Sequence, residues 1–156
     1  MIKKFLFLIL LTMSLFKVGY AADSVTGPTK IHNDMYLVSL SLTASGGTFS
    51  SIAINNDNAN ALTLLTGYWL SHVKVIPGST GPTDDSDLTI TVNGVDILGG
   101  NGANIVDNAT NGYCVPFGSN TDAQYPMSGS DDVLTVNISN NLVATASVTV
   151  LLVFEK

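Results

Sequence analysis

Short runs in which apolar and polar residues alternate are the feature that most constrains the fold of this chain. Residues 36–43 (YLVSLSLT) alternate leucine and valine with serine, and residues 87–92 (DLTITV) and 133–139 repeat the pattern. Successive side chains of a strand point to opposite sides, so a period of two places one side of each run in a core. No stretch after the N-terminal residues holds a convincing helical period. The chain therefore predicts an all-β structure.

Turn signals between these runs predict antiparallel pairing. Asn93-Gly94 is the strongest of them, because a type I′ hairpin turn requires positive φ at both central residues. Ser45-Gly46-Gly47 and Pro77-Gly78 end two other runs. We expect an antiparallel β-sandwich or jelly-roll of about seven to nine strands. Residues 35–156 would form this single domain.

The last run, residues 146–154, predicts an interaction surface. Its residues Leu152 and Phe154 share one face, but Leu151 and Val153 make the opposite face apolar as well. A strand that is apolar on both faces is central in its sheet or covered by a partner. We therefore predict that Leu151 and Val153 take part in oligomerisation. Earlier in the chain, alternation in the run YWLSHVKVI predicts that Trp69, Ser71, Val73 and Val75 share a buried face.

The N-terminus has the pattern of an export signal. Lys3 and Lys4 precede an apolar run over residues 5–16, and small residues end at Ala21. Residues 1–21 are predicted to be a signal peptide, with an uncleaved membrane anchor as the alternative. After cleavage no permanent membrane span is expected, because the apolar run is shorter than the roughly 20 residues needed to cross a bilayer. The polar residues 22–34 are predicted to be a linker or extended arm, and the protein is expected to be exported to the periplasm, the cell surface or the medium.

The charge of the chain argues against nucleic acid as a partner. The sequence has no arginine, and beyond Ala21 it keeps three lysines against twelve acidic residues, a net charge of −9. Such a surface repels phosphate and anionic lipid. Arginine is also the side chain best suited to paired hydrogen bonds with phosphates and bases.

Residues that could carry chemistry are few. Cys114 is the only cysteine, which excludes an intrachain disulfide and favours a small buried side chain. His32 and His72 lie far apart, and Glu155 is the only glutamate, so neither a catalytic triad nor a glycosidase pair is indicated. No enzyme activity and no cofactor are predicted.

Two weaker candidate sites remain. Asp84, Asp85 and Asp87 follow Pro82-Thr83, and carboxylates at this spacing can bind Ca²⁺, although aspartate is common in turns for backbone reasons alone. Aromatic residues suggest a sugar-stacking platform, with a role in the core or on a strand as the alternative. These aromatic residues are Tyr68, Trp69, Tyr113, Phe117 and Tyr125.

A series of motifs occupies the middle of the chain: GYWL at residues 67–70, VIPG at 75–78, GPTD at 81–84, DLTI at 87–90 and NGVDILGG at 93–100. Together they resemble a family of small tailed-phage and prophage virion proteins. In that family a strand that ends in Val-Pro-Gly leads into a Pro-Thr-Asp turn, a Tyr-Asp strand and a Gly-Val-Asp hairpin. Ser86 stands here where the family usually has the aromatic residue. The resemblance extends over residues 35–156 and rests on residues 67–70, 75–78, 81–84, 87–90, 93–100, 134–139 and 148–153.

This resemblance implies a non-enzymatic virion component, at the capsid surface or associated with the tail, that assembles in multiple copies with itself or with other virion proteins. The family has no catalytic residues to carry over. Export does not fit the cytoplasmic assembly of tailed phages, so a domesticated relative or a protein acting at the envelope is expected. A secreted carbohydrate-binding or adhesive β-sandwich is the alternative function, favoured by export, low charge and the tyrosine, tryptophan and asparagine content.

Overall fold

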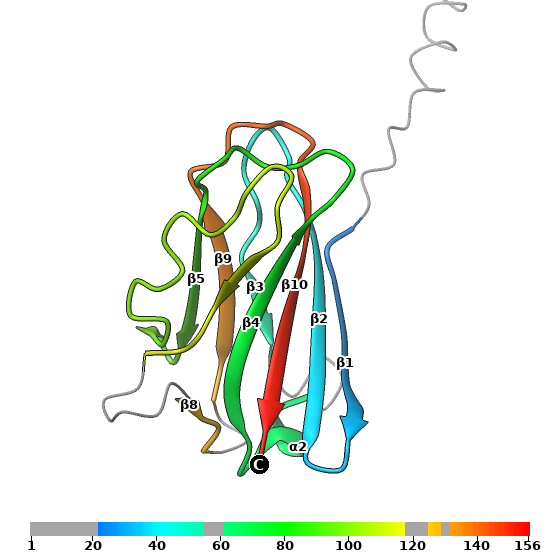
Figure 1. Ribbon diagram of the computed structural model, residues 1–156, viewed down its shortest axis with the longest axis vertical. Helices are drawn as coiled ribbons and strands as arrows, with labels where there is room; N and C mark the ends of the chain where they lie inside the picture. Colours follow the sequence, from blue (N-terminus) through cyan, green and yellow to red (C-terminus); the bar gives the residue numbers. More distant parts are fainter. Residues whose placement is uncertain (1–21, 55–60, 118–124, 129–131) are drawn as a thin grey trace, which may run out of the picture.

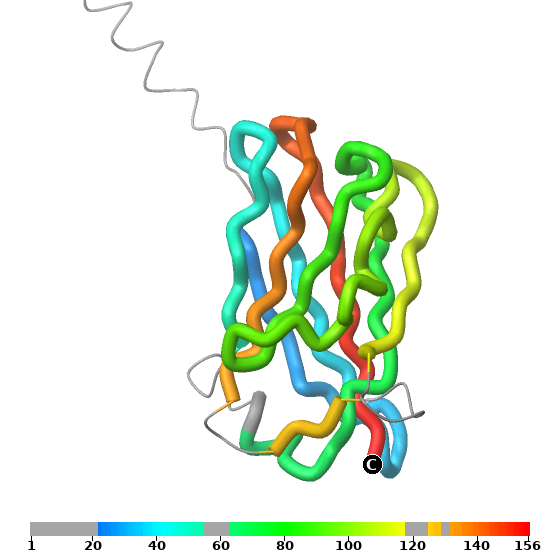
Figure 2. The backbone as a smooth tube through the Cα atoms, turned by 90° about the vertical axis from the view of Figure 1, so that its left-hand side faces the viewer, coloured from blue at the N-terminus to red at the C-terminus, as the bar shows by residue number. Residues whose placement is uncertain are grey.

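Two antiparallel sheets lie face to face in the computed structural model (Figures 1 and 2), which describes residues 22–54, 61–117, 125–128 and 132–156. This arrangement confirms the predicted β-sandwich. The predicted signal peptide lies outside the described residues. Within the described residues, no helix is long and apolar enough to span a membrane.

Among the residues that the structure describes, the two sheets have six and four strands. The larger has the order β1-β2-β10-β4-β7, and β8 pairs with β4 beside β7. Its strands are β1 (Ser24–His32), β2 (Met35–Thr43), β10 (Ser147–Glu155), β4 (Trp69–Pro77), β7 (Gly112–Cys114) and β8 (Tyr125–Pro126). The smaller sheet has the order β3-β9-β5-β6, with β3 (Ile52–Ile54), β9 (Leu134–Ser139), β5 (Asp87–Val92) and β6 (Val95–Asp96).

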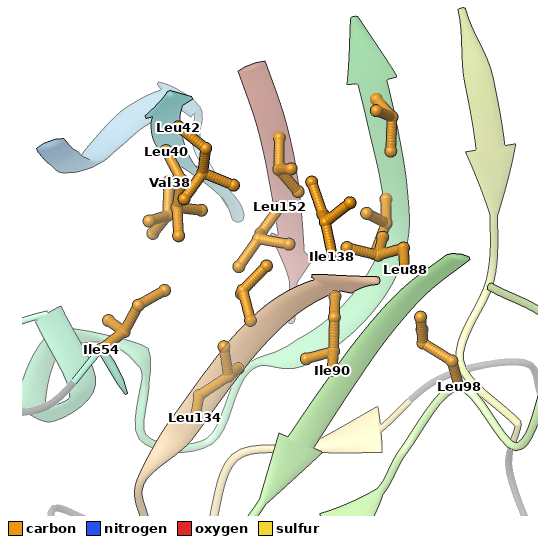
Figure 3. Close-up of a cluster of buried hydrophobic side chains, with 14 of the residues drawn as sticks. Val38, Leu40, Leu42, Ile54, Leu88, Ile90, Leu98, Leu134, Ile138 and Leu152 are labelled. Carbon is orange, nitrogen blue, oxygen red and sulfur yellow. The ribbon is translucent and has the colours of Figure 1, made fainter. Parts of the chain in front are cut away.

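The core lies between the sheets and follows the predicted alternation. In β5 the buried residues are Leu88, Ile90 and Val92, and in β10 Leu152 and Phe154 point the same way as Val150. Figure 3 shows side chains of both sheets converging in this layer. Burial of apolar surface of this kind is the main favourable term in folding, at about 25 cal/mol per Å².

The segment predicted to be a linker or extended arm is extended and is paired in the sheet. β1 lies antiparallel to β2 at the edge of the larger sheet, and its register shifts between Thr26 and Thr29. Gly27 and Pro28 fall in this irregularity, where a proline removes no regular ladder bond. A polar sequence is compatible with an edge strand, because most of its residues stay exposed.

A β-bulge in β4 reverses the predicted faces at the start of that strand. Val153 of β10 lies opposite His72 and Phe154 lies opposite Leu70, so Ser71 is an extra residue. The prediction for Trp69 was therefore wrong: Leu70 is buried with Val73, and Trp69 is 42% exposed. A strict period of two cannot reveal a single inserted residue.

The apolar run before β4 contains a short helix, α2 (Ala61–Leu65). Gly67 ends this segment with φ of +80°, a left-handed conformation that favours glycine. Its N–H donates to Met127 O, and Met127 N–H donates to Tyr68 O. These bonds join the start of β4 to the segment that contains β8.

Candidate functional site

The outer face of the six-stranded sheet is the candidate interaction surface, and strand register fixes its rows. One row contains Leu37, Val153 and His72 from β2, β10 and β4. The next contains Thr26, Ser39, Leu151, Lys74 and Tyr113, from β1 across to β7. We call this surface the six-strand face and these the middle rows.

The predicted interaction residues Leu151 and Val153 both lie on the six-strand face. Leu151 is half-buried, whereas Val153 is only 7% exposed although no sheet covers it. Leu37 and His72 flank Val153 in its row, and Leu37 is also half-buried. A partner would therefore contact chiefly Leu151 and Leu37, with Val153 beneath them.

The basic side chains of the middle rows are Lys74 and His72. Lys74 Nζ lies 5.3 Å from the centroid of the Tyr113 ring, within the range of a cation–π contact. The Ser71 hydroxyl donates to Val153 O and lies 2.9 Å from His72 Nδ1. Glu155, the acid of this sheet face, lies in the end row beside Met35 and Trp69.

The outer face of the four-stranded sheet has a different composition. Thr89 lies opposite Asn137, and Thr91 lies between Thr135 and Asp96. The hydroxyl of Ser51 donates to Asn137 Oδ1 at 3.0 Å. We call this surface the four-strand face; its charged residues among those described are Asp87 and Asp96.

Of the three aspartates predicted as a calcium site, Asp84 and Asp87 hold neighbouring loops. Asp84 Oδ1 accepts the N–H of Asn108, and Asp87 Oδ1 accepts the N–H of Asn104, both at 2.9 Å. Asp85 is exposed with φ of +60°, as aspartate in turns often is. In the described part of the chain, no three His, Cys, Asp or Glu side chains are grouped to hold a metal ion.

Asp107 caps the loop that Asp84 also contacts. Its Oδ1 accepts the N–H of Ala109 at 2.9 Å and that of Thr110 at 3.1 Å. The bond from Ala109 has the largest effect on this carboxyl group, followed by the bonds from Thr110. Because they stabilise the ionised carboxylate, these bonds lower the pKa of Asp107 to about 2. The turn is thus fixed by a charged acceptor.

The five predicted aromatic residues do not form one platform. Tyr113 and Trp69 are 62% and 42% exposed on the six-strand face, but they belong to different rows. Tyr68 packs edge-on against Tyr36 with ring centroids 5.1 Å apart. Phe117 is 64% exposed and its N–H donates to Ile97 O, while Tyr125 is half-buried in β8.

Cys114 and the two histidines are not brought together. Cys114 is buried on the inner side of β7, where burial, and to a lesser degree the charge of Asp96, raises the pKa of its thiol to about 11. His32 lies at the end of β1, at the sheet edge opposite β7. The thiol is therefore protonated at neutral pH and lacks the character of a nucleophile.

Two buried polar side chains that sequence reasoning missed organise the loops. Asn141 donates to Gly47 O and accepts the N–H of Thr83, which joins three loops at one end of the sandwich. Asp132 accepts from the side chain of Asn93 and from Ser128, which joins the β5–β6 turn to the segment after β8. Nothing in the local sequence separates these residues from the many other asparagines and aspartates in its turns.

Comparison of the chain with protein-family models, with curated proteins and with solved structures gives no match. The surface described above is therefore interpreted from its own geometry.

Proposed function

We propose that this protein is a non-enzymatic structural component that assembles in multiple copies at the cell envelope or in a particle of phage type. The observation that carries the proposal is the six-strand face, where half-buried Leu37 and Leu151 flank Val153 across two adjacent strands. Contiguous apolar surface on a sheet face is typical of interfaces. The resemblance of residues 67–100 to small virion proteins supports the same class of function.

Mass spectrometry of purified virions or surface assemblies from the source organism tests this proposal. We expect the chain in stoichiometric, multi-copy amounts and without residues 1–21. A strictly monomeric protein found free in the medium, and absent from particles, would contradict it. Neighbouring capsid and tail genes would further support the proposal, whereas neighbouring polysaccharide genes would favour the alternative below.

A secreted carbohydrate-binding protein is the second candidate, favoured by the exposure of Tyr113 and Trp69 on the six-strand face. Aromatic rings that keep a free face can stack on sugars, but the Tyr113 ring is already approached by Lys74. A glycan array with and without Ca²⁺ separates the two functions. Binding that is lost in Tyr113→Ala and kept in Phe117→Ala would favour the sugar-binding function.

A further inference from the structure

We propose that copies of this chain stack face to back, with the six-strand face of one copy on the four-strand face of the next. This inference rests on the proposed function and names the partner of the surface as a second copy. It starts from the different charges of the two faces. The middle rows of the six-strand face present the cation Lys74, with Glu155 apart in the end row, whereas the four-strand face presents Asp87 and Asp96.

The orientation of the contact follows from this charge pattern. A symmetric contact between two six-strand faces would bring Lys74 close to its own copy, and two four-strand faces would bring Asp87 and Asp96 close to theirs. Juxtaposed like charges are unfavourable at an interface. Face-to-back contact instead sets the face that holds Lys74 against the face that holds Asp87 and Asp96, which avoids both repulsive contacts.

The side chains between the charges are compatible with this contact. Leu37 and Leu151 on one face would meet Thr89, Thr91 and Thr135 on the other, all half-buried within their own sheets. The methyl group of threonine packs on apolar surface, and its hydroxyl stays available to polar neighbours. Stacked sheets pack about 10 Å apart, so side chains of this size fill the space between two copies.

The contact is heterologous, because the two copies use different surfaces. Such an interface continues from copy to copy and forms a ring or an open filament, whereas a symmetric interface stops at the dimer. Multi-copy assembly then needs no second partner. Both faces of the sandwich are used, and its edges stay free.

A complementation experiment with two variants tests the stacking. Lys74→Glu places an acid in the six-strand face, and Thr89→Lys places a base in the four-strand face. Sedimentation velocity is measured on the protein as recovered from cells that express the full chain, at about 0.02 M and about 0.5 M salt. We expect the wild-type protein to form a concentration-dependent series of oligomers that weakens at high salt.

Each variant alone is expected to associate at least about tenfold more weakly, because its altered face repels the other face of the next copy. Mixed one to one, the two variants should associate again, because their unaltered faces form the wild-type contact and their altered faces carry opposite charges. Matched controls with the same charge change elsewhere, Lys156→Glu and Ser79→Lys, should associate like the wild type. Equal thermal unfolding midpoints for all proteins show that the fold is retained.

Three outcomes would overturn the stacking. One is a wild-type protein that is monomeric at both salt concentrations. The second is association that neither Lys74→Glu nor Thr89→Lys weakens, and the third is a closed dimer that only one variant disrupts. In each case the chain could still be abundant in purified particles, so the proposed function is judged separately by mass spectrometry.

Discussion

At the residue scale, Asp107 shows how single carboxylates hold the loops. Its pKa of about 2 lies below the ordinary value of 3.8, so ionised Asp107 stabilises the folded loop above pH 3.8. That stabilisation is lost as the pH falls through about 2. We expect the amide NMR signal of Ala109 to titrate with a midpoint near pH 2, and Asp107→Asn to abolish the transition. Asp85→Asn in the neighbouring loop is the control and should leave the titration unchanged.

The thiol of Cys114 gives a second prediction for a single residue. With a pKa of about 11, roughly one thiol in a thousand is ionised at pH 8, and the side chain is buried as well. Iodoacetamide should therefore label native protein far more slowly than protein unfolded in urea. Rapid native labelling would show that β7 opens away from β4.

At the element scale, Gly27 is the residue on which the edge strand β1 depends. Its φ is +105°, and a Cβ added there would lie 2.5 Å from Leu37 O. Because that atom belongs to the backbone of β2, we expect Gly27→Ala to lower the free energy of unfolding by at least about 2 kcal/mol. Gly46→Ala is the matched control, since it also has positive φ but open space around it, and should cost about 1 kcal/mol. Urea denaturation measures both.

The elements that the sequence predicted are those whose two sides differ in polarity. β2, β5 and β9 each bury one side, as β10 does up to Leu152, so a period of two identifies them and their buried residues. β1 was missed as a strand because both its sides are largely solvated and its ladder is interrupted by a bulge. α2 was missed because five residues are too few for a helical period to appear.

The six-strand face could be predicted from the sequence only in part, because alternation describes residues within one strand and not those of its neighbours. Leu151 and Val153 are recognisable because they are apolar where alternation calls for polar residues. Their neighbours Lys74 and Leu37 come from distant parts of the chain, and only strand order and register bring them together. The bulge at Ser71 also decides that Trp69, and not Leu70, faces outward at the start of β4.

At the scale of the whole molecule, the sandwich separates folding from assembly. The two sheets are held together by the apolar residues between them, and each sheet has a second face that contributes less to that core. Substitutions on the inner and outer sides of the same strand should therefore have different effects. β10 permits a direct comparison, because the same residue type occupies both sides at adjacent positions.

Leu152 and Leu151 are this pair. Leu152 is fully buried between the sheets, whereas Leu151 is half-buried on the six-strand face. We expect Leu152→Ala to lower the free energy of unfolding by about 2–5 kcal/mol, because it leaves a cavity in the core. Leu151→Ala should cost less than about 1.5 kcal/mol in the monomer, because only part of its apolar surface is buried there.

Urea denaturation at low protein concentration and high salt measures these monomer effects, and sedimentation velocity at low salt measures association. Leu151→Ala should weaken association while leaving the fold intact. Leu152→Ala should lower stability without changing the surface through which folded copies meet. Equal losses of stability in the two variants would show that Leu151 is already enclosed in the monomer, and the six-strand face would then offer little apolar surface to a second copy.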